Sequence, residues 1–81
     1  MKNFIAVIGL GYVGLPLAAS AAKSGYTVIG VDINIERVNE INNGISPIED
    51  ISSSEILDLV ERGLLRANSD YSAIRGADVI L

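Results

Sequence analysis

A glycine-rich turn between an apolar run and a helical pattern constrains the fold of this chain more than any other feature. The turn, at residues 9–14, reads G-L-G-Y-V-G and has the spacing G-x-G-x-x-G. The run before it, Phe4–Ile8, is apolar, partly β-branched and stopped by a glycine, which favours a buried strand over a buried helix. The segment after it, Val13–Ser24, has helical periodicity, and Gly25 follows where a C-terminal cap glycine is expected. The rest of the chain must therefore build on a strand that leads through three glycines into a helix.

The remaining segments continue an alternation of strands and helices. This alternation predicts an α/β fold with a parallel sheet and right-handed crossovers. We expect the first half of a Rossmann-type, doubly wound sheet, with strand order 3-2-1-4 and flanking helices, truncated inside the fourth strand. Residues 1–81 would then form the amino-terminal part of one dinucleotide-binding domain. After the first helix we predict a strand at Tyr26–Val31, a helix at Ile35–Asn42 capped by Asn34, a helix from Ser53 or Ser54 to Arg62 with a capping box of Ser52 and Glu55, a strand at Leu64–Asn68, a helical turn at Tyr71–Arg75 and a strand at Ala77–Leu81.

Each glycine of the turn suits a separate task in binding a dinucleotide. Gly9 permits the tight turn from strand to helix, Gly11 lets a diphosphate approach the backbone, and Gly14 lets the helix lie close to the sheet. The helix dipole contributes only about 0.3–1 kcal/mol per charge. Hydrogen bonds from unpaired N–H groups, including those of Tyr12 and Val13, must therefore supply more of the binding of the anion. Two alternatives stay open: that the glycines serve tight packing alone, and that Tyr12 walls the core instead of covering the pyrophosphate.

An acidic residue ends the second predicted strand. Asp32 follows Gly14 by 18 residues, near the offset of about 20 at which this kind of fold carries the acid that binds the adenosine ribose. Its carboxylate would accept both ribose hydroxyls and would repel a 2′-phosphate, since two unit charges ~4 Å apart at an effective dielectric of ~20 interact by roughly 4 kcal/mol. We therefore predict NAD rather than NADP as the cofactor. As alternatives, Asp32 could cap the helix that begins near Asn34, and Arg37 could either lie over the adenine or ribose or be an exposed helical arginine.

Composition and charge exclude several other functions for this segment. The chain has a net charge of −4 and no cluster of lysine and arginine, so we expect no surface for nucleic acid or for an anionic membrane. It has no cysteine and no histidine, which removes thiolate metal sites, a cysteine nucleophile and the commonest general base. We predict no metal site and no membrane-spanning run or signal peptide, and a cytoplasmic location is the default expectation.

Several strings resemble the amino-terminal NAD-binding part of the UDP-glucose/GDP-mannose dehydrogenase family. The string Gly11-Tyr12-Val13-Gly14-Leu15-Pro16 is more specific than the bare glycine pattern. Arg37 lies where the family carries a basic residue near the adenosine ribose. The likeness covers nearly the whole chain, through the strings at residues 5–18, 31–34, 46–49, 65–70 and 77–81.

The resemblance implies that the full-length parent is an NAD-dependent nucleotide-sugar dehydrogenase. Such enzymes oxidise the C6 alcohol of a UDP-sugar to a uronate in two NAD-dependent steps through a cysteine-bound thiohemiacetal. The loop sequence leans towards members that act on UDP-N-acetylhexosamines. Because the family's catalytic residues and sugar-nucleotide site lie later, we expect this chain to hold no catalytic residue and to be inactive by itself. The UDP-sugar would be a partner of the full-length, homo-oligomeric parent. Two alternatives remain, the NAD-binding part of another dehydrogenase of similar fold and a non-catalytic nucleotide-sensing module.

Overall fold

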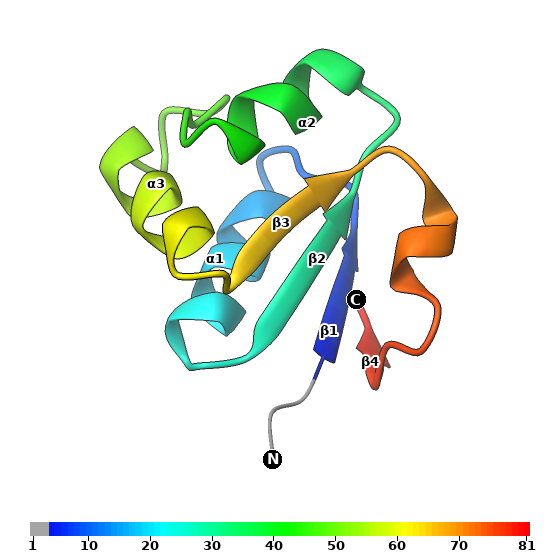
Figure 1. Ribbon diagram of the computed structural model, residues 1–81. Coiled ribbons are helices and arrows are strands. Elements are labelled where there is room, and N and C mark those ends of the chain that lie inside the picture. Colours follow the sequence, from blue (N-terminus) through cyan, green and yellow to red (C-terminus); the bar gives the residue numbers. More distant parts are fainter. Residues whose placement is uncertain (1–3) are drawn as a thin grey trace.

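A four-stranded parallel sheet with the strand order β3-β2-β1-β4 forms the centre of the protein (Figure 1). The computed structural model describes residues 4–81, and the predicted domain range of 1–81 thus includes three residues outside the described ones. The strands are β1 (Phe4–Ile8), β2 (Thr27–Val31), β3 (Leu65–Asn68) and β4 (Val79–Ile80). All three strand pairings are parallel, so the predicted α/β class and the predicted strand order are confirmed.

Three helices cover one side of this sheet, and a short 3-10 helix lies on the other side (Figure 1). They are α1 (Gly14–Lys23), α2 (Ile35–Asn42), α3 (Ser53–Glu61) and η1 (Tyr71–Ile74). Asn34 caps α2 as predicted, because its side-chain oxygen accepts the N–H of Arg37 at 3.1 Å. Ser52 caps α3 in the same way, but the second half of the predicted capping box is not formed, because the carboxylate of Glu55 forms an ion pair with Lys23 of α1 instead. That ion pair links the first and third helices across the sequence.

The core lies between the sheet and these three helices. In the sheet, Ile5, Val28 and Leu65 form one row of opposed residues that belongs to the central apolar cluster. From α1, the cluster receives small side chains such as those of Ala18 and Ala22, which are fully buried and let the helix lie close to the strands. The largest fully buried side chains are Leu10, Leu15, Ile41, Ile56, Leu59, Leu65, Val7, Val28 and Val31.

Three strands are shorter at their start than predicted, because their expected first residues are used to close the preceding helix. The N–H of Tyr26 donates to Ala21 at the end of α1, and the N–H of Leu64 donates to Leu59 at the end of α3. The N–H of Ala77 likewise donates to Ile74 in η1. Each of these amides is therefore unavailable to the sheet.

The two outer strands are fixed by single polar side chains. On the outer edge of β3, the amide of Asn42 donates to the carbonyl oxygen of Ala67 at 2.8 Å and accepts its N–H at 2.9 Å. At the start of β4, a carboxylate oxygen of Asp78 accepts the N–H of Phe4 at 2.8 Å, while the N–H of Asp78 donates to the carbonyl of Phe4. Asn42 thus occupies part of one sheet edge, and Asp78 sets the register of the other outer strand.

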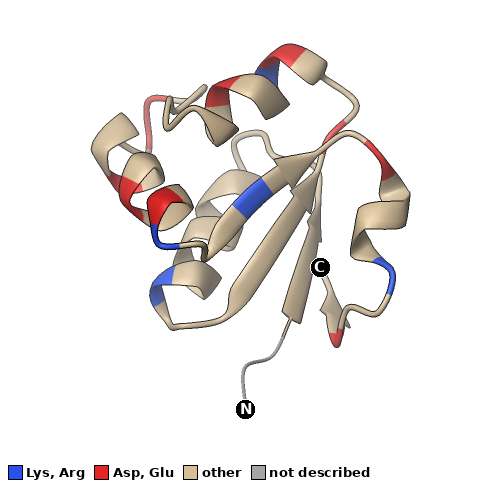
Figure 2. Ribbon diagram, in the orientation of Figure 1, with Lys and Arg blue, Asp and Glu red and all other residues tan. Residues whose placement is uncertain are grey.

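Most acidic residues lie on α2, on α3 and on the connection between them (Figure 2). The glycine turn itself carries no charged residue. The negative net charge of the chain is therefore concentrated away from the amino end of α1. Within residues 4–81, no helix combines the length and the apolar character needed to cross a membrane.

Candidate functional site

The outer two glycines of the turn are required by the fold itself. Gly9 has a φ of +87°, in the left-handed region that side chains disfavour, and it changes the chain direction directly after β1. A Cβ added to Gly14 would overlap the carbonyl oxygen of Gly9, so the first turn of α1 lies directly against the end of β1. These two positions confirm the predicted tight turn and the predicted close approach of the helix.

The middle glycine has no such structural reason. The φ of Gly11 lies outside the left-handed region, and a Cβ added there would meet only the Nη1 atom of Arg37, at an ordinary contact distance of 3.8 Å. Neither the backbone conformation nor the packing of the core therefore requires a glycine at position 11. This favours the prediction that a ligand approaches here, over the alternative that all three glycines serve packing.

Leu10, between the first two glycines, anchors the turn to the sheet. Its side chain is fully buried and packs against Gly30, where an added Cβ would overlap the leucine side chain. Its N–H donates to Oδ2 of Asp32 at 2.8 Å. Sequence reasoning missed this contact, although a lone glycine inside a strand signals a close approach by another part of the chain.

The backbone amides around the amino end of α1 are unpaired. None of the N–H groups of residues 11–14 donates a hydrogen bond to any group of residues 4–81. Val13 is the N-cap residue, and its apolar side chain provides no acceptor. Most N-cap residues are polar because these donors need acceptors. The free amides and the positive end of the helix dipole therefore favour an anion at this surface.

A cavity of about 420 Å³ opens at this surface. Tyr12 and Val13 project beside it, with exposed fractions of 69% and 82%. The alternative that Tyr12 walls the core is therefore wrong. The cavity lies where β1 and β4 end and α1 begins, and it is lined by Val7, Ile8, Gly9, Gly11, Tyr12, Val13, Gly14, Leu17 and Leu81.

Asp32 lies at the end of β2 and is only 9% exposed. Its Oδ2 atom accepts the N–H of Leu10, and its Oδ1 atom accepts the N–H of Asn34 at 2.9 Å. Burial alone would raise the pKa of this carboxyl, but the hydrogen bonds from Leu10, Asn34 and Arg37 outweigh burial and hold the pKa below its ordinary value. The carboxylate is thus ionised at neutral pH. The N-cap of α2 is Asn34, so Asp32 does not serve only to cap that helix, as the alternative held. Asp32 instead connects the glycine turn to the start of α2.

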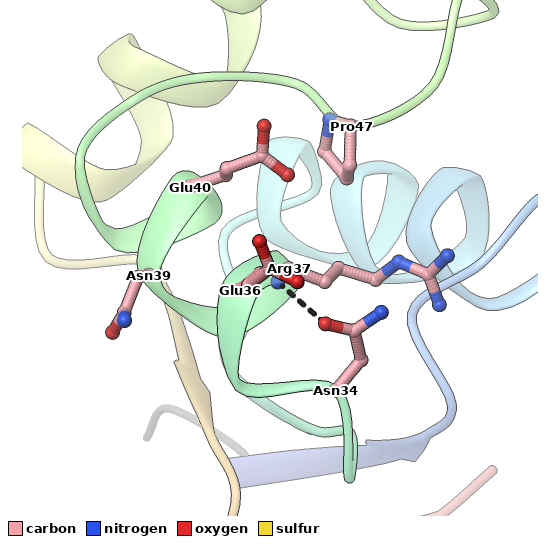
Figure 3. A pocket seen from close by; sticks show the side chains of 6 residues that line it. All are labelled: Asn34, Glu36, Arg37, Asn39, Glu40 and Pro47. Atoms are coloured by element: carbon pink, nitrogen blue, oxygen red, sulfur yellow. Dashed lines mark hydrogen bonds between the residues drawn. The ribbon is translucent and has the colours of Figure 1, made fainter.

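Arg37 extends from α2 towards the glycine turn (Figure 3). Its Nη1 atom lies 3.3 Å from Oδ2 of Asp32, and its side chain is 31% exposed. Its Nε atom is buried and has no hydrogen-bond partner. The alternative of an ordinary exposed helical arginine is therefore wrong, and the guanidinium lies beside both Asp32 and Gly11.

A second, shallow pocket of about 490 Å³ lies along the outer side of α2 (Figure 3). Its lining residues are Asn34, Glu36, Arg37, Asn39, Glu40 and Pro47, so it shares only Arg37 with the residues predicted to bind the cofactor. Its two glutamates, Glu36 and Glu40, oppose an anion. Within residues 4–81, no group of three or more histidine, cysteine or acidic side chains is arranged to hold a metal ion. The turn cavity therefore remains the candidate site.

Comparison with known proteins gives a consistent result. The family model of the NAD-binding domain of the UDP-glucose/GDP-mannose dehydrogenase family matches residues 3–81. A UDP-N-acetyl-D-mannosamine dehydrogenase of Methanococcus vannielii is 63% identical over 57% of this chain, and a GDP-mannose 6-dehydrogenase of Pseudomonas savastanoi is 40% identical over 93% of it. The solved structure of the UDP-D-ManNAc dehydrogenase of Pyrococcus horikoshii superposes on 95% of the chain with a TM-score of 0.88 and 37% identity. The chain spans only 11%, 18% and 19% of these three proteins, respectively.

Proposed function

This chain belongs to the UDP-glucose/GDP-mannose dehydrogenase family, and we propose that its glycine turn, Asp32 and Arg37 together form the adenosine-diphosphate half of an NAD site. The matched domain of the family is the NAD-binding one, so NAD is the cofactor of this region. Family membership also removes the alternative of an unrelated dehydrogenase of similar fold. The residues that we assign to the cofactor are Gly9, Gly11, Tyr12, Val13, Gly14, Asp32 and Arg37.

The single observation that carries this proposal is the set of unpaired amides at residues 11–14, which open onto the turn cavity. A diphosphate bound there would receive hydrogen bonds from these N–H groups, and bonds to charged groups are the stronger class. Gly11 leaves the space for its approach. Gly9 and Gly14 act indirectly, because they allow the turn and the close position of α1.

Asp32 supplies the second half of the proposed recognition. Its ionised carboxylate lies one strand away from the turn and is tied to it through Leu10. It would accept hydrogen bonds from the adenosine ribose, and its charge disfavours a phosphate at the 2′ position. We therefore assign NAD, and not NADP, to this site.

For the full-length protein we propose oxidation of a nucleotide sugar at C6, in keeping with the dehydrogenases that this chain resembles. Bound NAD supplies the hydride acceptor for such a reaction. The role of this chain's own residues is to bind and orient the cofactor, because the chain contains no cysteine or histidine that could serve as nucleophile or base. A UDP-N-acetylhexosamine substrate, a homo-oligomeric assembly and a cytoplasmic location belong to the same proposal.

Calorimetric titration of the purified chain with NAD and with ADP tests the cofactor site. We expect both ligands to bind with similar affinity, since the assigned residues contact only the part of NAD that ADP shares. Asp32→Asn should weaken both ligands by roughly tenfold or more, because a hydrogen bond to a charged group is worth about 1.5–3 kcal/mol. Asp58→Asn is the matched control, since Asp58 is an exposed acid on α3. A chain that is folded by circular dichroism and binds neither ligand would contradict the proposal.

A further inference from the structure

The Asp32 carboxylate is nearly saturated by hydrogen bonds from the protein itself. Oδ2 accepts from the N–H of Leu10 at 2.8 Å and from Nη1 of Arg37 at 3.3 Å, and Oδ1 accepts from the N–H of Asn34 at 2.9 Å. A carboxylate offers about four lone-pair sites. Only about one site is therefore left, although a ribose that donates both of its hydroxyls needs two.

Two of these three hydrogen bonds cannot be given up cheaply. The bond from Leu10 holds the glycine turn against the end of β2, and Leu10 is fully buried. The bond from Asn34 fixes the start of α2, where Asn34 is the N-cap. Breaking either one would disturb the backbone around the site.

The bond from Arg37 differs from the other two. It is the longest of the three and comes from a side chain that is 31% exposed. The Nε atom of the same guanidinium has no partner, so the group is held by this single contact. Of the three donors to Asp32, Arg37 can therefore be displaced at the smallest cost in free energy.

The guanidinium also lies beside the open side of the glycine turn. Its Nη1 atom lies 3.8 Å from the position that a Cβ on Gly11 would take, on the side of the turn that Gly11 leaves open. Figure 3 shows the side chain extended from α2 across to the turn, away from the neighbouring Glu36 and Glu40. Arg37 and one hydroxyl of the adenosine ribose would therefore compete for the same carboxylate oxygen.

We propose, on the basis of the cofactor site assigned above, that Arg37 is a positioning residue that stands in for the ribose while the site is empty. Its Nη1 atom keeps Oδ2 of Asp32 aimed at the turn cavity and satisfies the lone pair that a ribose hydroxyl later takes. When a nucleoside diphosphate binds, one hydroxyl replaces Nη1 at Oδ2, and the guanidinium moves off the carboxylate. Arg37 thus lowers the cost of leaving Asp32 unliganded in a largely buried position.

This exchange predicts how much a ribose hydroxyl contributes to binding. If a deoxy ligand binds to the unchanged protein, Arg37 stays on Asp32 and no acceptor is left unsatisfied. If Arg37 is replaced by methionine, the same deoxy ligand leaves Oδ2 short of a donor. The penalty for removing that hydroxyl should therefore be larger in the variant than in the unchanged protein.

The test compares the affinities of ADP, 2′-deoxy-ADP and 3′-deoxy-ADP for the unchanged chain and for Arg37→Met, measured by calorimetry. For one of the two deoxy ligands, we expect a loss below about threefold in the unchanged chain and of roughly tenfold or more in Arg37→Met. Arg62→Met is the matched control, because Arg62 also contacts an acid, Asp58, through Nη1 at 3.3 Å but lies on exposed α3. This control should show the penalties of the unchanged chain.

Equal penalties in the unchanged chain and in Arg37→Met, or a larger penalty in the unchanged chain, would overturn the role given to Arg37. That result would leave ADP binding intact and so would not touch the cofactor site. Failure of every folded protein to bind ADP would instead remove the cofactor site and the role of Arg37 together. If Arg37→Met does not fold, Arg37→Leu provides the same comparison, since it also lacks a donor.

Discussion

Replacing Gly11 by alanine should change the stability of the fold and the affinity for nucleotide in opposite directions. The nearest atom to an added Cβ is Nη1 of Arg37 at 3.8 Å, which is an ordinary contact, and the φ of Gly11 is not in the left-handed region. The alanine methyl therefore meets no obstacle, while alanine restricts the unfolded chain. We expect Gly11→Ala to raise the free energy of unfolding by about 0.4–1 kcal/mol. At about 4–8 °C per kcal/mol for a domain of this size, the midpoint of thermal unfolding should rise by roughly 2–8 °C.

The same methyl group should abolish most of the nucleotide binding. It would extend into the space beside Gly11 through which the proposed diphosphate approaches. Loss of one or two hydrogen bonds to a charged group, each worth about 1.5–3 kcal/mol, corresponds to a loss of affinity of at least roughly tenfold. A ligand at 100 times its Kd stabilises a protein by about 2.7 kcal/mol, so the stabilisation by NAD seen in the unchanged chain should largely disappear.

Gly14→Ala is the matched control, with the opposite expected result for stability. Its Cβ would overlap the carbonyl oxygen of Gly9, so α1 would have to shift, at a cost of about 1–3 kcal/mol or more. Thermal unfolding followed by circular dichroism, with and without NAD, measures both effects in one experiment. A lower unfolding midpoint for Gly11→Ala would show that the fold needs this glycine, and unchanged NAD binding would show that no diphosphate lies there.

Four further predictions concern Asp32, the sheet edge and catalysis. NAD should bind over tenfold more tightly than NADP, and Asp32→Asn should narrow this ratio in paired titrations; tighter NADP binding by the unchanged chain would contradict the role of Asp32. Because the pKa of Asp32 is lowered in the folded state, ionisation of this carboxyl stabilises the fold at pH values above its ordinary pKa of 3.8. This stabilisation is lost as the pH falls through the folded-state pKa, so the difference in unfolding free energy between the unchanged chain and Asp32→Asn should shrink over that range in denaturant titrations. Asn42→Leu should cost about 1–3 kcal/mol by leaving the backbone of Ala67 unpaired, whereas the exposed Asn39→Leu should cost little, and equal losses in urea unfolding would refute the pairing. The chain should oxidise no UDP-sugar in an NADH absorbance assay, and any turnover would place catalytic groups within these residues.

Sequence pattern alone located each helix and strand within residues 4–81. Each segment is short, has a clear period or apolar run, and is bounded by glycine or a capping residue, so local preferences and the fold agree. The errors lie at boundaries such as Tyr26 and Leu64, where an amide could serve either the sheet or the end of a helix. That choice depends on where the neighbouring strand lies, which a local pattern does not encode.

The candidate site was predictable in its parts but not in its internal contacts. Spacing placed the glycine turn and Asp32 at adjacent strand ends, because strand ends in a parallel sheet share one edge. Three contacts were not predictable: the packing of Leu10 on Gly30, the hydrogen bond from Leu10 to Asp32, and the position of Arg37 beside Gly11. Each joins residues distant in the sequence, and each depends on side-chain orientation after the elements have packed.

The hydrogen bonds of Asn42 to β3 leave only one edge of the sheet open to a further strand. A side-chain amide already occupies Ala67 on that flank, so a further strand, from whatever polypeptide, would find its backbone partners on the opposite flank, beside β4. The residue after β4, Leu81, also lines the cavity at the glycine turn. A strand added beside β4 would therefore also add a wall to the proposed cofactor pocket.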